Sequence, residues 1–146
     1  MLTASQNAQG VNIAGMWPSQ KVVAAEVPER ARQFLSQALD SLHAPSGAVM
    51  LTASSVDAML KDKGYKSGSL NARIDEAAKA HLITAEMAAW AHEIRLDAND
   101  QRHADETAEM PTPEDAARLI EFAEALAQFL FVLPARVAHG RNPSPP

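Results

Sequence analysis

Apolar side chains recur with the period of an α-helix through residues 112–136, TPEDAARLIEFAEALAQFLFVLPAR. Thr112 is placed to cap this helix, Pro113 suits its first turn, and the two acidic residues that follow favour the positive end of the helix dipole. Pro134 should end or kink it. A stripe of this length has to pack against other helices, so a helical bundle is the expected fold. The stripe consists of Leu119, Phe122, Leu126, Phe129, Leu130 and Leu133.

Four further helices are expected upstream. The first runs from about Pro28 to His43, the second from Pro45 to a stop at Gly64, and the third over residues 70–81. The fourth begins at Thr84, whose hydroxyl can cap free amides, and extends to His103. The side chains expected to face inward in the first three helices are Ala31, Phe34, Leu35, Ala38, Leu39 and Leu42, then Val49, Ala53, Val56 and Leu60, and then Leu70, Ile74, Ala77 and Ala78.

The chain shows no alternation typical of strands and no solenoid repeat, so we expect an all-α bundle of four or five helices. Its 146 residues fit one domain, which we place at 27–137, between a loose arm at 1–26 and a disordered, Pro-rich tail at 138–146. The first residues lack the charge and apolar core of a signal peptide, and no apolar run is long enough to span a membrane. The expected location is the cytoplasm.

Composition removes several function classes. The formal charge is −5, which argues against a broad nucleic-acid footprint, although a local basic site remains open. The absence of cysteine excludes disulfides, cysteine-based zinc sites and thiol catalysis. His92 and Glu93 begin an apparent zinc-protease motif, but Leu96 stands where its second His belongs. We therefore expect no metal and no cofactor.

The stretch HEIRLDANDQRH, residues 92–103, gathers polar groups on one side of the expected fourth helix. At 100° per residue these groups span roughly 100°, and the apolar residues of the same helix fall on the other side. The polar face consists of His92, Arg95, Asn99, Arg102 and His103, and the apolar face of Met87, Trp90, Ile94 and Ala98.

Two interpretations of this face stay open. Any amphipathic helix has a solvated side, and an Arg/Asn/His face is most often that. Alternatively the face serves a phosphodiester, because a guanidinium can hold a phosphate through two hydrogen bonds and a His can move a proton at neutral pH. The candidate catalytic residues are then Arg95, Asn99 and His103, and the candidate phosphate-binding residues are Arg95, Arg102 and His92.

Four segments together resemble a bacterial family of domains of unknown function, number 4145, over residues 27–137. They are VPERARQFLSQAL, KDKG, LNARIDEAAKAHLITAEMAAWAHEIRLDANDQRH and TPEDAARLIEFAEALAQFLFVLPARV. That family is similar to the HEPN superfamily of helical bundles. In active HEPN members an Arg and a His form a metal-independent RNase site at a dimer interface, and such members occur in toxin–antitoxin, CRISPR, abortive-infection and restriction systems.

The resemblance implies one of two functions. An active member would be a metal-independent endoribonuclease that acts as a homodimer and uses Arg95, Asn99 and His103. However, Ala98 stands where the family commonly has Gly, the second helix lacks the family's Arg and Glu, and the spacing from Arg95 to His103 exceeds that of the best-supported nucleases. These departures favour a non-catalytic helical module. It would bind a protein partner, or the phosphate of RNA or a nucleotide, in a bacterial defence or toxin–antitoxin setting.

Overall fold

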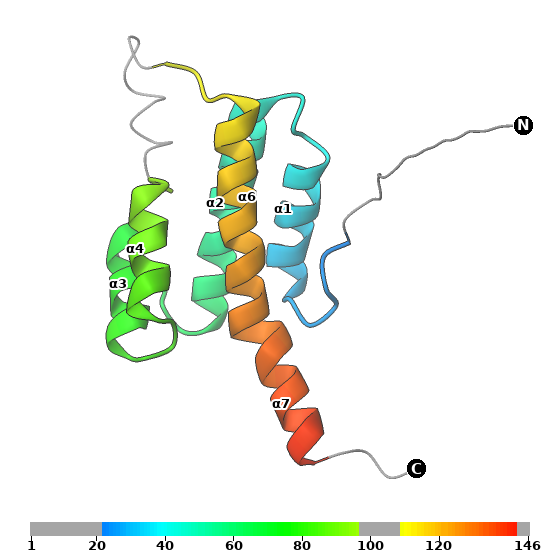
Figure 1. The fold of residues 1–146 in the computed structure, drawn as a ribbon, viewed down its shortest axis with the longest axis vertical. Helices are drawn as coiled ribbons and strands as arrows, with labels where there is room; N and C mark the ends of the chain where they lie inside the picture. Colours follow the sequence, from blue (N-terminus) through cyan, green and yellow to red (C-terminus); the bar gives the residue numbers. More distant parts are fainter. Residues whose placement is uncertain (1–21, 97–108, 143–146) are drawn as a thin grey trace, which may run out of the picture.

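The computed structural model describes residues 22–96 and 109–142, and all regular structure within them is helical (Figure 1). The expected all-α bundle is confirmed. Its elements are α1 (Glu29–Leu39), α2 (Pro45–Asp62), α3 (Leu70–Lys79), α4 (Ala85–Glu93), α6 (Pro113–Ala127), a π-helical turn (Gln128–Val132) and α7 (Leu133–Arg141). None of the helices in these ranges combines the length and apolarity that crossing a membrane requires.

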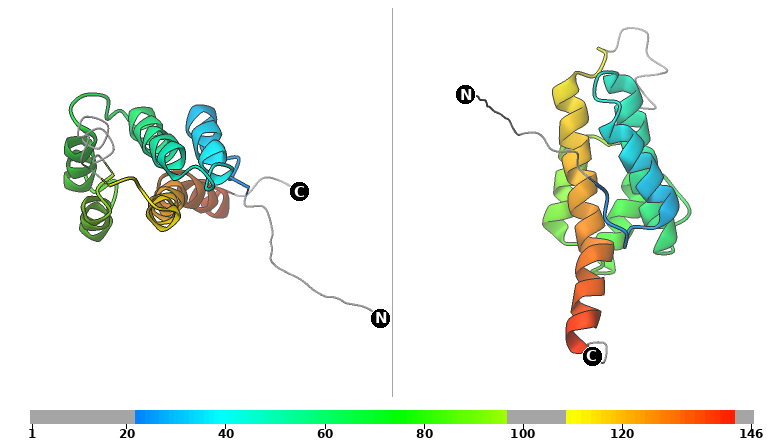
Figure 2. Two further views of the ribbon diagram at one scale, coloured as in Figure 1. Left: turned by 90° about the horizontal axis from the view of Figure 1, so that it is seen from above. Right: turned by 90° about the vertical axis from the view of Figure 1, so that its right-hand side faces the viewer.

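Helices α1, α2 and α6 form the main body, and the α3–α4 pair packs at its side (Figures 1 and 2). One continuous core joins them, and its burial supplies the main driving force for this arrangement. Trp90 of α4 meets Phe122 of α6 edge to face, with ring centroids 5.2 Å apart. The largest fully buried side chains are Phe122, Leu35, Met59, Leu60, Ile74 and Leu96.

Small residues line the contact between α1 and α2. The buried Ser55 hydroxyl of α2 donates a hydrogen bond of 2.7 Å to the carbonyl oxygen of Ala31 in α1, and Ala38 is fully buried. Thr52, also buried, donates to the carbonyl oxygen of Ala48 within its own helix, at 2.7 Å. Ala53, which we expected to face inward, is only half-buried. The buried face of α2 therefore includes two hydroxyl-bearing residues that hydrophobicity alone does not identify.

Local signals set several helix ends. Thr112 caps α6, as the sequence predicts, and Asp115 completes a reciprocal capping box in which each side chain accepts a hydrogen bond from the backbone of the other. Gly64 ends α2 with φ +97°, and the Tyr65 amide donates to the Leu60 carbonyl to close the turn. His81 follows the end of α3 in the same way that Gly64 follows the end of α2, and its φ is +60°. Helix α1 ends at Leu39, earlier than expected, and Leu42 is exposed.

The helix that starts at Pro113 continues through Pro134 to Arg141, past the domain boundary expected at residue 137. A proline removes one amide donor and collides with the carbonyl four residues earlier. Here the π-helical turn ends two residues before Pro134, and the Leu133 amide donates to the Gln128 carbonyl, five residues back. Helix α7 extends beyond the body and has no buried residue (Figure 1). Leu133, expected in the core, is 49% exposed.

Candidate functional site

Helix α4 ends at Glu93, so the expectation of one helix from Thr84 to His103 is wrong. Ile94 is the last residue with helical backbone angles, and Arg95 has φ +56°, in the left-handed region that favours glycine. The Arg95 amide donates to the His92 carbonyl at 3.2 Å, which closes the turn. His92 therefore lies in the last turn of α4, whereas Arg95 lies after its end.

Burial of Leu96 explains why the helix ends here. Leu96 is fully buried in the core. On a continued helix it would lie about 100° from Arg95, outside the arc of apolar residues that contains Trp90 and Ile94. The left-handed turn at Arg95 changes the direction of the chain. Leu96 therefore enters the core, while Arg95 stays exposed.

His92 contacts α3 through both nitrogens of its ring. Its Nε2 atom lies 2.7 Å from Oδ1 of Asp75, and its Nδ1 atom lies 3.2 Å from Oδ1 of Asn71. The side chain of His92 is 36% exposed and that of Asp75 is 56% exposed. These contacts join α4 to α3, and they involve one of the candidate phosphate-binding residues.

The other candidate residues fall in a range that is not described. Asn99, Arg102 and His103 lie within 97–108, and Arg95 alone of the candidate catalytic residues is placed. The described residues contain no group of three His, Asp or Glu side chains arranged to hold a metal ion.

An ion-pair network fixes α3 against α2. Asp57 pairs with Arg73 and with Lys61, whose Nζ lies 2.9 Å from the carboxylate. The guanidinium of Arg73 also donates to the Tyr65 carbonyl at 3.4 Å, while its buried Nε has no hydrogen-bond partner among the described residues. Burial raises the pKa of Asp57, but the hydrogen bonds and positive charges of Lys61 and Arg73 outweigh this and leave the pKa below its ordinary value.

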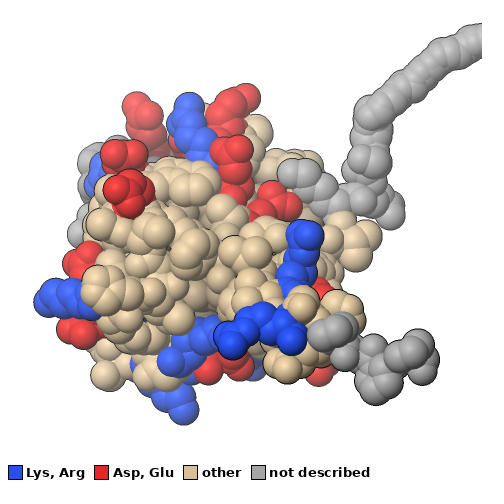
Figure 3. Space-filling view, turned by 60° about the horizontal axis from the view of Figure 1, so that its bottom comes forward, with Lys and Arg blue, Asp and Glu red and all other residues tan. Residues whose placement is uncertain are grey.

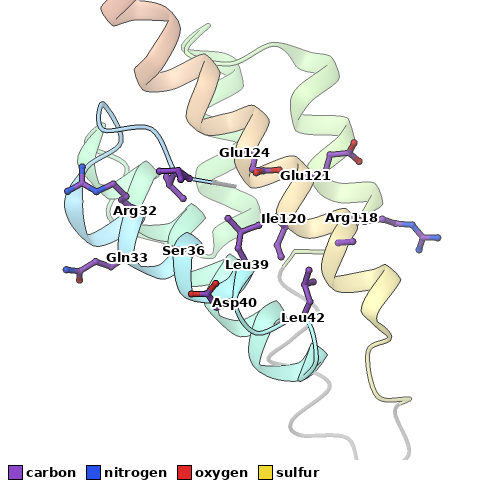
Figure 4. A pocket seen from close by; sticks show the side chains of 13 residues that line it. Arg32, Gln33, Ser36, Leu39, Asp40, Leu42, Arg118, Ile120, Glu121 and Glu124 are labelled. Carbon is purple, nitrogen blue, oxygen red and sulfur yellow. The ribbon is translucent and has the colours of Figure 1, made fainter. Parts of the chain in front are cut away.

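A groove of about 950 Å³ lies between α1 and α6, and we call it the α1/α6 groove (Figure 4). Leu39 and Ile120 face each other across it, whereas Arg118 points away (Figure 4). Its lining mixes apolar side chains with both signs of charge. The residues that define it are Val23, Arg32, Leu39, Asp40, Ile120 and Glu121.

A second groove, of about 640 Å³, lies where α7 leaves the body, and we call it the α7 groove. The end of α2 and the turn between α3 and α4 form its other wall. Its apolar lining consists of Leu82, Phe129, Leu130, Leu133, Pro134, Val137 and Ala138. Lys63, His81 and Arg141 stand among these residues, and none of the described residues that line it is acidic.

Charge is unevenly distributed around this end of the molecule. Helix α7 carries Arg136, His139 and Arg141 and no acidic residue. Lys63 lies over the ring of Phe131, with Nζ 4.6 Å from the ring centroid. Figure 3 looks toward this end and shows Lys and Arg gathered in its lower part, with most Asp and Glu along the upper edge.

The α7 groove was not expected from the sequence. The expected apolar stripe ended at Leu133, and the expected domain boundary at residue 137 fell before Arg141. A usable signal was present, because Leu133 and Val137 are one turn apart and continue an apolar face beyond Pro134.

Comparison with known proteins gives a family but no characterised relative. No curated protein and no solved structure matches the chain. A family model, described as a domain of unknown function, matches residues 32–142, which include all of α2, α3, α4, α6 and α7. The chain belongs to this domain-of-unknown-function family, DUF4145.

Proposed function

We propose that this chain is a non-catalytic helical binding module that holds a protein partner in the α7 groove. One observation carries the proposal. Helix α7 extends from the body with no buried residue and exposes Leu133 and Val137, at 49% and 50%, beside a groove with a mainly apolar lining. A groove with apolar lining and a few polar groups is a common form of binding site.

The backbone at this place gives further support. Phe129 and Leu130 line the groove and belong to the π-helical turn, and such turns inside helices occur frequently at functional sites. The groove-lining residues of α7 also fall on one side of the helix, because Leu133, Val137 and Arg141 are spaced by four. An amphipathic helix of a partner protein can dock its apolar face into a groove of this shape.

The end of α4 favours binding over catalysis. The nuclease hypothesis places Arg95, Asn99 and His103 on one helix face, whereas α4 ends at Glu93 and His92 contacts Asp75. Under the proposed likeness to HEPN bundles, a module of this kind would hold a partner protein in a bacterial defence or toxin–antitoxin system.

The test is selection of binders from a displayed library of helical peptides, using the full chain. Val137→Asp changes the groove, and Met50→Asp is the matched control because Met50 is 44% exposed on α2. We expect the selected peptides to bind the wild type and the Met50→Asp variant saturably. They should not bind the Val137→Asp variant. Peptides that bind all three proteins equally, or a library that yields no saturable binder, would overturn the proposal.

A metal-independent endoribonuclease that acts as a homodimer is a second candidate, because Arg95 is exposed and its guanidinium is a group that can hold a phosphate. The test is RNA cleavage in EDTA by the wild type and by His103→Ala, with matched circular dichroism. Cleavage by the wild type alone, together with a dimer by light scattering, would support the nuclease, and no cleavage by either would exclude it.

A further inference from the structure

We infer that the α7 groove takes an acidic amphipathic helix, in which a stripe of apolar side chains enters the groove and Asp or Glu residues flank the stripe. This inference rests on the proposed function, because it names the chemistry of the partner that the same groove would hold.

The apolar part of the groove sets the first requirement on the partner. A volume of about 640 Å³ lies within the range of roughly 300–1,000 Å³ that is typical of ligand pockets. Leu133 and Val137 on one wall and Leu82 on the other present only carbon to an occupant. A helix whose apolar residues recur one turn apart can place two of them there at once.

The charged part sets the second requirement. Lys63 and Arg141 bear positive charge, His81 gains it on protonation, and all three line the groove. Because no described lining residue is acidic, a partner with flanking carboxylates would meet only complementary charge, and a cationic partner only repulsion.

Other occupants fit these observations less well. The groove has Leu82 on the wall opposite Leu133 and Val137, so a flat membrane surface would not fill it, and nucleic acid would need a denser set of cations. A second copy that pairs α7 with α7 about a two-fold axis would bring Arg141 and its symmetry mate to the same interface, with no acidic residue of α7 to offset them.

The experiment uses two dye-labelled helical peptides that share one leucine stripe. One carries Glu at its flanking positions and its twin carries Lys at the same positions. Binding to the full chain is followed by fluorescence anisotropy at low and at physiological salt. We expect the Glu peptide to bind at least about tenfold more tightly than the Lys peptide at low salt, and the difference to shrink as salt rises.

Two arginines of α7 provide matched variants. Arg141 lines the groove, whereas Arg136 belongs to the same helix and does not line it. Arg141→Glu should weaken binding of the Glu peptide at least about fivefold, and Arg136→Glu less than about twofold. Both residues are exposed, so circular dichroism and thermal unfolding should show that each variant remains folded.

The other outcomes overturn the inference, and they separate it from the proposed function. If both peptides bind alike and Val137→Asp abolishes both, the groove binds protein but does not select acidic partners. If the Glu peptide does not bind, or binds Val137→Asp and Arg141→Glu as well as the wild type, the inference fails, and the library selection decides the proposed function.

Displacement of the peptide by poly-uridine RNA or by anionic vesicles would assign the groove to those ligands. A wild-type dimer that Val137→Asp makes monomeric would assign it to a second copy.

Discussion

The imidazole Nε2 of His92 lies 2.7 Å from the carboxylate oxygen Oδ1 of Asp75, which joins α4 to α3 across their exposed edge. Because both side chains are partly exposed, this contact contributes modestly to stability. His92→Ala should lower the free energy of unfolding by about 1 kcal/mol, measured by urea denaturation. His139→Ala, at an exposed His of α7, is the control and should change it by less than about 0.5 kcal/mol. Equal effects of the two substitutions would show that the contact between His92 and Asp75 adds nothing to stability.

The left-handed backbone at Arg95 gives a second prediction. Glycine adopts φ +56° without the penalty that a side chain incurs, so Arg95→Gly should raise the free energy of unfolding by about 0.5–1 kcal/mol. Arg136→Gly, within α7, should lower it by up to about 1 kcal/mol, because glycine is unfavourable inside a helix. Thermal unfolding of the two variants tests this, and a loss of stability in Arg95→Gly would mean that the arginine side chain itself holds the turn.

The third prediction concerns the hydroxyl of Ser55. It donates to the Ala31 carbonyl across the α1–α2 contact, so Ser55→Ala should destabilise the protein by about 1 kcal/mol. The neighbouring Ser54 is only half-buried, and Ser54→Ala should be nearly neutral. Urea denaturation midpoints measure both, and if Ser55→Ala is as stable as the wild type, the hydroxyl has no net role in joining the helices.

The fourth prediction concerns pH. The pKa of Asp57 is lowered in the folded state, so its contribution to stability is fully present above the ordinary value of 3.8 and is lost as the pH falls through the lower folded pKa. Asp57→Asn should remove this part of the acid dependence. At neutral pH it should also cost roughly 3 kcal/mol, because it leaves the buried guanidinium of Arg73 without its anionic partner.

The measurement is unfolding by urea at several pH values from neutral to strongly acid. The control is Asp62→Asn, at an exposed residue near the end of the same helix, which should keep the acid dependence of the wild type. Unfolding curves of Asp57→Asn that shift with pH in parallel with the wild type would contradict the assignment to Asp57.

Sequence reasoning succeeded where a local signal decides the structure. The Thr112 cap and the Gly64 stop each depend on residues within one turn, and the structure confirms both. Helix existence and the all-α fold followed from the period of apolar residues in the same way.

The end of α4 could not be predicted in this way. No glycine or proline marks it, and the deciding interaction is the burial of Leu96 in a core made by other helices. The residue that turns the chain is an arginine, which local propensity does not place in a left-handed turn. One cue was available, since Leu96 lies off the apolar arc of the expected helix. The exposure of Leu133 could not be predicted either. Periodicity identifies an apolar face of a helix, but it does not show whether another helix covers that face.

The π-helical turn before Pro134 has a consequence for how this family can diversify. An α-helix rotates each residue by about 100°, so removing one residue from Gln128–Val132 would turn the whole of α7 by that angle about its axis. Leu133, Val137 and Arg141 would then face away from Lys63 and Leu82, and a different side of the helix would meet the body. A single codon inserted or deleted within these five positions thus exchanges one presented surface for another, while the core formed by α1, α2 and α6 keeps its sequence.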